Sequence, residues 1–399
     1  MYAAVWLAMG RPHEMLLTLA AGRPSTRSAH PDEGGRELVR SAFEHHLFGL
    51  LWSAVRRGDI VLGHDVESGL AVQVLMTRSR HEQLWATIAD ISARLNGSGI
   101  EFAVMKGLPA EDRWYAARGE RPCADVDVLV APGDIDRLPE LVGALDPEYS
   151  LRPTILDEYQ RGLVHGLDLE MDGVTVDIHL DAVKIGPLGR GSDAMWDHTE
   201  LHATPTGGSV RVLDAEASLF HFLLTLNKDG FCRLLGYADV ARILDRASID
   251  WNAFRDLADS YGLDTVVHSS LEAVTSTLAL PSRAAVAPRP RGRVRARAWR
   301  LLWPPAVRLQ GQMGWVRHRR RVWWLPLLAT GHLRETVRWW LGRVLLTPAL
   351  VAHGNPGVRG PWFWRLLVGR AHRWRVRRRR VASLRSEDGR LLSKPPWPT

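Results

Sequence analysis

A short run in which acidic and aliphatic residues alternate constrains the fold of this chain more than any other feature. Residues 125–130 read Asp-Val-Asp-Val-Leu-Val. Successive side chains of a β-strand point to opposite faces, so Asp125 and Asp127 share one face while most of the aliphatic residues cover the other. Two ionised carboxylates held side by side repel each other, and a divalent cation is the usual remedy.

A second strand of the same kind lies farther along the chain. Residues 174–180 read Val-Thr-Val-Asp-Ile-His-Leu, which places Asp177 and His179 on one face. If this strand pairs beside the first, the carboxylates of Asp125, Asp127 and Asp177 converge. Three carboxylates can hold two magnesium ions roughly 3.5–4 Å apart, one activating an attacking hydroxyl and the other steadying triphosphate oxygens.

The strand and helix patterns around these runs predict an α/β segment. An Asp-Gly pair, Asp172-Gly173, stands between two alternating runs and predicts a hairpin. A helix is expected behind Lys106-Gly107, over residues 108–117, and another over 135–145, where Pro139 weakens the pattern. The expected strands are 100–105, 125–130, 163–170 and 174–180.

Periodicity and composition divide the whole chain into five segments. Apolar residues at three- and four-residue intervals predict helices before and after the α/β segment, and residues 11–35, rich in Gly, Pro and Ser, are expected to form a loop. After Gly207-Gly208 the chain is expected to turn helical again. The predicted segments are a helical region (1–98), the α/β core (99–213), four helices (214–282), an Arg/Trp-rich block (283–380) and a disordered polar tail (381–399).

A family resemblance is carried by residues 102–130, FAVMKGLPAEDRWYAARGERPCADVDVLV. This stretch resembles the bacterial uncharacterised nucleotidyltransferase family of the DNA polymerase β-like superfamily. The family pattern is a strand, Lys-Gly, a helix ending near Tyr, Arg-Pro, two spacers, and Asp-x-Asp-x-Leu-Val. The matching positions are Lys106-Gly107, Tyr115, Arg121-Pro122, 125–130 and, for the downstream acid-x-His element, Asp177-Ile178-His179. The resemblance covers about residues 35–280.

The resemblance implies the fold class and the reaction. The fold is expected to be α+β, a polymerase β-like nucleotidyltransferase core with a mixed or antiparallel sheet, flanked by N-terminal and C-terminal helical regions. Asp125, Asp127 and Asp177 are expected to be the catalytic residues and the ligands of two Mg²⁺ ions. The enzyme would transfer a nucleoside monophosphate from an NTP to a hydroxyl or phosphate of a small molecule, peptide or protein, and release pyrophosphate.

The triphosphate site departs from the superfamily pattern. The superfamily usually has Gly-Ser at the helix start, where backbone amides and the Ser hydroxyl bind phosphates, whereas Leu108 follows Gly107 here. Lys106, the backbone of Gly107 and Arg121 are therefore expected to bind the triphosphate. Arg121 has an equally good alternative, an ion pair with Asp125 or Asp127.

Other polar residues near the motifs have structural alternatives. Glu170 is the reserve third carboxylate, but it flanks the predicted turn and is expected to be solvated. His179 is either a hydrogen-bonded structural residue or a metal ligand, and the structural role is the commoner one for such a histidine. His165 and His221 are expected to be structural, and Cys123 is expected to pack rather than react, because nothing nearby in sequence supplies a general base.

Charge is distributed unevenly along the chain. Residues 283–380 hold 24 Arg, no Lys and one acid, Glu335, for a net charge of +23, and the remainder carries −15. Ten of the 17 Trp lie in the same block. Interleaved Arg and Trp can follow a nucleic-acid backbone, lie at an anionic membrane surface, or form an Arg-faced helical domain with buried Trp rings.

Two other functional hypotheses follow. One is a non-catalytic protein that binds nucleic acid or membrane on a degenerate transferase scaffold, although the intact acids count against degeneration. The other is a tailoring enzyme for a bacterial peptide or other secondary product, and it is suggested only by what is usual for the family that the chain resembles. The base preference, the acceptor and the oligomeric state stay open.

The compartment is expected to be the cytoplasm. Cys123 and Cys232 are the only cysteines, which excludes a disulfide framework. The longest apolar stretches are too short to span a bilayer, and no basic region precedes the apolar residues near the N-terminus, as a secretory signal requires.

Overall fold

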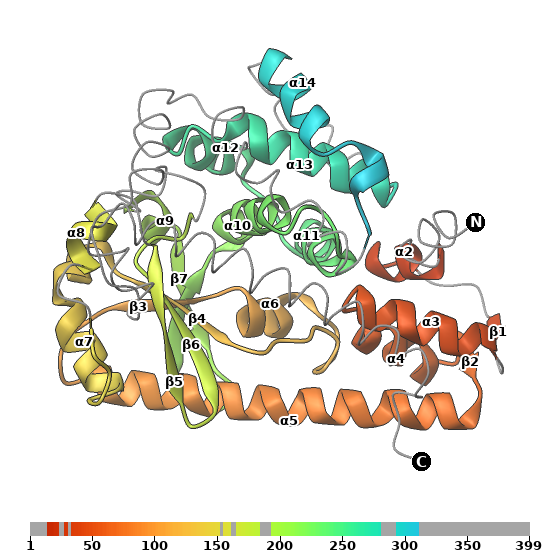
Figure 1. Ribbon diagram of the computed structural model, residues 1–399, viewed down its shortest axis with the longest axis horizontal. Coiled ribbons are helices and arrows are strands. Elements are labelled where there is room, and N and C mark those ends of the chain that lie inside the picture. Colours follow the sequence, from red (N-terminus) through yellow and green to blue (C-terminus); the bar gives the residue numbers. More distant parts are fainter. Residues whose placement is uncertain are drawn as a thin grey trace, which may run out of the picture. The chain divides into compact units, whose positions relative to one another are not determined.

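A computed structural model gives the fold (Figure 1). It describes residues 14–23, 28–30, 33–151, 155–160, 165–183, 193–280 and 293–310. The chain divides into two compact units, residues 1–336 and 337–399, and every described residue belongs to the first. The predicted tail and most of the predicted Arg/Trp-rich block therefore lie outside the described residues.

A six-stranded mixed sheet forms the centre of the α/β core. Strands β3 and β4 are antiparallel, whereas β4 runs parallel to β6 and β3 runs parallel to β8. The antiparallel strands β5 and β7 form the two edges. In spatial order the strands are β5 (Gly166–Met171), β6 (Val174–His179), β4 (Val126–Val130), β3 (Phe102–Met105), β8 (Ser209–Leu213) and β7 (Thr199–Ala203).

The predicted hairpin between β5 and β6 is confirmed. The two strands pair from Met171 opposite Val174 to Gly166 opposite His179. Asp172 and Gly173, at the turn, have φ angles of 48° and 75°. Two successive positive φ angles are what a two-residue type I′ turn requires, and Asp-Gly supplies them at low cost.

The sheet has an apolar face and a mixed face because its side chains alternate. Val126, Val128 and Val130 point into a core together with Val176 and Ile178. Helices α5 (His64–Leu95) and α7 (Leu138–Leu145) close this core, and Figure 1 shows α5 running beneath the sheet and on toward the N-terminal helices. Burial of each aliphatic side chain stabilises the fold by about 1.5–3 kcal/mol. A register shift of one residue would turn these side chains to the other face of the sheet and lose that stabilisation.

The expected N-terminal helical region contains more structure than predicted. The segment 11–35 is not a plain loop, because it includes α2 (Glu14–Ala20), β1 (Ser28–His30) and the start of α3. Leu16 and Leu19 of α2 are buried, and α2 packs on α4 (Phe48–Arg56) and α11 (Leu234–Arg246), so tertiary contacts override the loop-like composition. The other elements are α3 (Glu33–Glu44), α4 (Phe48–Arg56) and β2 (Ile60–Leu62), which pairs parallel to β1.

The four helices predicted after the core are confirmed, but the chain does not turn helical directly after Gly207-Gly208. Those glycines lie in the turn of a β-hairpin, and β8 follows them before the helices begin. Asp214 and Asp250 cap two of the helices by accepting backbone N–H bonds. The four helices are α10 (Ala215–Lys228), α11 (Leu234–Arg246), α12 (Trp251–Ser260) and α13 (Asp264–Thr277).

The remaining elements are short. The predicted helix over 135–145 is divided into a 3₁₀ helix, η1 (Pro132–Arg137), and α7, whose first turn accommodates Pro139. The others are α6 (Gly107–Trp114), α8 (Ile155–Gln160), α9 (Asp193–Asp197) and η3 (Pro305–Val307).

One helix of the predicted Arg/Trp-rich block is described, α14 (Arg293–Leu302), and it docks through tryptophan. The Trp299 indole donates to the Asn227 side-chain oxygen at 2.8 Å, and Asn227 in turn donates to Ser270 at 2.6 Å. Trp299 and Trp303 are fully buried beside Phe231. These two rings therefore fit the interpretation in which Trp is buried and Arg faces outward.

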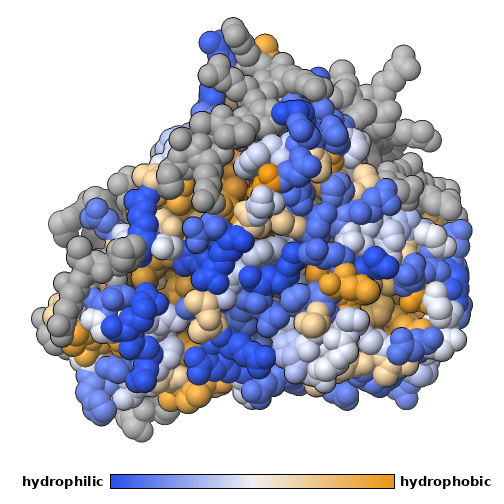
Figure 2. Space-filling view, turned by 180° about the vertical axis from the view of Figure 1, so that it is seen from behind, coloured by the Kyte–Doolittle hydropathy of each residue, from blue (hydrophilic) through white to orange (hydrophobic). Residues whose placement is uncertain are grey.

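The described surface is largely hydrophilic. Figure 2 shows mainly hydrophilic side chains on the rear face, interrupted by hydrophobic patches. The exposed large hydrophobic residues include Val72, Leu75 and Met76 of α5. Among the described ranges, every helix is too short or too polar to cross a membrane.

Candidate metal and nucleotide site

Two acidic residues meet because β4 and β6 pair in parallel. Asp127 of β4 lies directly opposite Asp177 of β6, on the face of the sheet that is turned away from the α5 core. Asp127 is buried, with 6% of its surface exposed, and Asp177 is half-buried. The predicted pairing of these two strands is therefore confirmed.

His179 completes a compact group with the two carboxylates. Its ring is fully buried, and Nε2 lies 2.7 Å from Asp127 Oδ1 and 3.1 Å from Asp177 Oδ2. One potential ligand atom from each residue lies within 4.8 Å of the other two. Carboxylate oxygens and an imidazole nitrogen at this spacing can share one divalent cation.

Lys106 contributes a positive charge from the neighbouring strand end. It follows β3 and its ammonium group donates a hydrogen bond to Asp127 Oδ1. Its φ of 55° lies in the region that favours glycine, so holding Lys106 there costs about 1–3 kcal/mol. Strain of this kind is concentrated at functional sites, which supports a role for the Lys106-Gly107 turn.

Gly107 opens α6 at a point where a side chain has no room. A Cβ at this position would lie 2.2 Å from the sulfur of Cys123. Burial raises the pKa of the Cys123 thiol to about 12, which opposes thiolate formation. The role of Cys123 is therefore structural: it packs closely against Gly107 and lies in the segment that leads into β4.

Asp125 stands apart from the Asp127–Asp177–His179 group. It precedes β4, its side chain is exposed, and it is not one of the three residues whose ligand atoms lie together. It is still within electrostatic reach, because loss of solvation and then repulsion from Asp127 raise the pKa of Asp125 above 3.8. The structure thus brings two of the three predicted acids together and places the third at the rim.

Asp127 itself is kept ionised. Burial alone would raise its pKa, but the Lys106 ammonium and the hydrogen bond from His179 outweigh burial and hold the pKa of Asp127 well below its ordinary range. A permanently ionised carboxylate is a better cation ligand than one that must first lose a proton.

Arg121 does not pair with either of the acids expected from the sequence. Its guanidinium group is buried and donates to both carboxylate oxygens of Asp239, at 2.7 and 3.0 Å. The Tyr115 hydroxyl donates to the same carboxylate at 2.7 Å. Asp239 lies on α11, so this pair ties the segment before β4 to the C-terminal helices.

A second buried acid holds the same segment. Glu111 of α6 accepts backbone N–H bonds from Gly119 and Arg121 at 2.7 and 3.3 Å. Its other oxygen lies 2.6 Å from His81 Nδ1 of α5. Together with the Arg121–Asp239 pair, these contacts position the chain that enters β4 with Asp125 and Asp127.

The other polar candidates from the sequence lie in different environments. Glu170 is exposed and accepts a 3.3 Å bond from Thr175, and His165 lies 3.5 Å from Asp181. His221 of α10 is buried close enough to the site that, after burial, the charges of Lys106 and His179 lower its pKa. The Asp-x-His spacing was the only sequence signal for His179, whereas His221 was expected only as a structural histidine.

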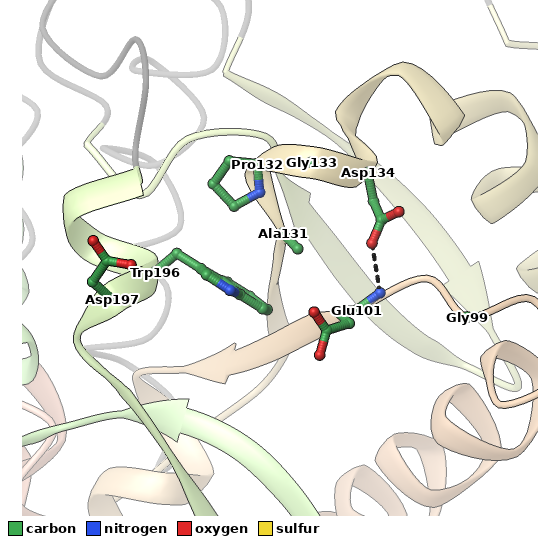
Figure 3. A pocket seen from close by; sticks show the side chains of 8 residues that line it. All are labelled: Gly99, Glu101, Ala131, Pro132, Gly133, Asp134, Trp196 and Asp197. Atoms are coloured by element: carbon green, nitrogen blue, oxygen red, sulfur yellow. Dashed lines mark hydrogen bonds between the residues drawn. The ribbon is translucent and has the colours of Figure 1, made fainter.

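A surface pocket lies elsewhere on the core. It has a volume of about 480 Å³ and includes Glu101, which precedes β3, and Asp134, which follows β4. Figure 3 shows the Trp196 ring lying across this pocket and the bond from the Glu101 amide to Asp134. It is at the opposite end of β3 and β4 from Lys106 and Asp127, so it is not part of the candidate site.

Comparison with protein-family models gives a match. A family model described as "Uncharacterised nucleotidyltransferase" matches residues 31–279. This range spans the whole six-stranded sheet, the candidate site and helices α10 to α13. It agrees with the extent of the resemblance seen in the sequence. No curated protein matches the chain.

The Arg121–Asp239 pair gives a stability prediction. Asp239→Asn should lower the free energy of unfolding by about 3 kcal/mol, because it leaves a buried guanidinium without its charged partner. The double variant Arg121→Met with Asp239→Leu should recover part of that loss. Urea denaturation followed by circular dichroism measures both, with Asp245→Asn, an exposed position on the same helix, as the control. An unchanged stability of Asp239→Asn would contradict the structural role of Arg121.

Asp125 gives a pH prediction. Its folded-state pKa is raised, so the folded protein holds that proton more tightly, and stability falls as the pH rises above 3.8. Without divalent cations, Asp125→Asn should therefore be more stable than the wild type at about pH 7, by less than about 1 kcal/mol because the group is exposed. The gain should disappear below about pH 3, where Asp125 is largely protonated in both states. Thermal denaturation across pH tests this, with Asp136→Asn as the exposed control; a loss of stability at neutral pH would contradict it.

Proposed function

Because the chain belongs to the uncharacterised nucleotidyltransferase family, and is therefore a nucleotidyltransferase, we propose how its site performs nucleotidyl transfer. The enzyme transfers a nucleoside monophosphate from an NTP to a hydroxyl or phosphate acceptor and releases pyrophosphate. The observation that carries the proposal is the pairing of Asp127 with Asp177 on adjacent parallel strands.

The residues at this point suit a divalent cation. Asp127 and Asp177 offer carboxylate oxygens, and the Nε2 atom of His179 faces both of them. Asp127 and Asp177 would hold the cation, with Asp125 at the rim as the third acid. A bound cation neutralises phosphate charge and lowers the pKa of an attacking hydroxyl. Mg²⁺ and a second ion stay predictions.

Lys106 is the residue best placed to bind the triphosphate. Its ammonium group already lies beside Asp127, and its own backbone turns the chain into α6. A small rotation of the side chain would exchange Asp127 for a phosphate oxygen. The Gly107 backbone amide lies at the start of the same helix, where N–H groups favour an anion.

Arg121 has a different role in this proposal. Its guanidinium group donates from one edge to both oxygens of a buried carboxylate, so using that edge to bind a triphosphate would require breaking the Asp239 pair. We therefore assign Arg121 to positioning the segment that carries Asp125 and Asp127. Lys106 and the amide of Gly107 remain as the phosphate-binding groups.

The chemical step is a displacement at phosphorus. The acceptor oxygen forms a bond to the α-phosphorus, the bond from the α-phosphorus to the bridging oxygen breaks, and pyrophosphate leaves. A hydroxyl acceptor gives its proton to a carboxylate at the site. The protein forms no covalent bond to the substrate, and its contribution is to align the acceptor and to stabilise negative charge.

Product analysis tests the proposal. The wild type is incubated with each NTP, a divalent cation and pools of candidate acceptors, and products are weighed by mass spectrometry while pyrophosphate is measured. The expected result is a mass gain of one nucleoside monophosphate with equimolar pyrophosphate. Asp127→Asn and Asp177→Asn should each lower the rate by at least about 100-fold, because removing one ligand or charge from such a site costs several kcal/mol.

Glu170→Gln is the matched control for these variants. Glu170 lies in β5, the strand beside β6, is exposed and is not part of the candidate site. The activity of the Glu170→Gln variant should therefore stay within about twofold of the wild type. Circular dichroism and the thermal midpoint check that each variant is folded. Full activity in a folded Asp127→Asn or Asp177→Asn variant would contradict the proposal.

A further inference from the structure

The donor set of the candidate cation site contains a nitrogen. The Nε2 atom of His179 lies 2.7 Å from Asp127 Oδ1 and 3.1 Å from Asp177 Oδ2, so it faces the gap between the two carboxylates. The ring is fully buried, and its position is fixed by the pairing of Leu129 in β4 with His179 in β6. Nε2 is therefore placed to act as a further ligand of a cation that both carboxylates bind.

We propose that His179 is the third protein ligand of this cation and that it makes the site select Mn²⁺ or a similar transition-metal ion over Mg²⁺. This inference rests on the proposed function, since it concerns the same site. Mg²⁺ favours a shell made only of oxygen, and it keeps several of its waters. An imidazole nitrogen among the ligands favours a first-row transition metal.

Charge compensation does not require His179 to act as a cation toward Asp127. The Lys106 ammonium already bonds the same carboxylate oxygen and supplies a full positive charge. Once Lys106 turns to the triphosphate, as in the proposed function, the two carboxylates balance one divalent ion and the imidazole can be neutral. Two carboxylates with one imidazole thus form a neutral set with the metal, which suits a buried position.

The environment of the other ring nitrogen, Nδ1, allows His179 to change its tautomer. His179 Nδ1 is buried and has no hydrogen-bond partner in the part of the chain that the structure describes. In the structure Nε2 donates a hydrogen bond to Asp127 Oδ1, but no partner at Nδ1 among the described residues holds the ring in that tautomer. When a cation binds between the carboxylates, the proton can move to Nδ1, and the Nε2 lone pair then becomes available to the cation.

Electron paramagnetic resonance of Mn²⁺ tests the assignment without relying on turnover. Mn²⁺ is added to metal-free full-length protein, and the electron spin echo is examined for modulation by a directly bound ¹⁴N. The wild type should show nitrogen modulation, and His179→Gln should lose it. Mn²⁺ affinity should fall at least about tenfold in His179→Gln, whereas Mg²⁺ affinity, measured by competition, should change less than about threefold.

His165→Gln is the matched control, because His165 lies beside Asp181 and not in the group, and it should keep the nitrogen signal. Bound Mn²⁺ without nitrogen modulation in the wild type, or equal losses of Mn²⁺ and Mg²⁺ affinity in His179→Gln, would overturn the assignment of His179 and leave the proposed function standing. If neither metal binds, or if Asp127→Asn binds both as tightly as the wild type, the proposed cation site fails as well.

Discussion

The parallel pairing of β4 with β6 is the constraint on which the site depends. It places Asp127 opposite Asp177 and Leu129 opposite His179, and alternation then puts the polar groups on one face. The opposite face of the same strands carries the valines and isoleucine that pack against α5 and α7. A slip of one residue would bury the acids in that core, so the apolar packing that stabilises the sheet also fixes the site.

Like charges brought together in this way need compensation. Lys106 and His179 supply it at Asp127, whereas at Asp125 loss of solvation and repulsion from Asp127 outweigh the attraction of Lys106 and keep the pKa raised. Outside the site, the buried Arg121–Asp239 pair holds the segment that enters β4. The C-terminal helices therefore help to position residues that come from the sheet.

Local patterns predicted much of this arrangement. Alternation located β4 and β6, and Asp172-Gly173 located the hairpin, because both signals depend on neighbouring residues. Contacts between distant residues could not be read in the same way: Arg121 and Asp239 are 118 positions apart, and the Asp-x-His spacing did not show how close His179 Nε2 lies to both carboxylates. Helix α2 was missed for a related reason, since its burial depends on α4 and α11.

Diffraction from crystals containing Mn²⁺ and an NTP analogue with a non-hydrolysable α–β bridge tests the central claim most directly. We predict an anomalous peak within about 2–2.5 Å of carboxylate oxygens from both Asp127 and Asp177, with Lys106 turned toward the triphosphate. A peak bound elsewhere, or an analogue bound with Lys106 still on Asp127 and no metal between the two acids, would contradict it.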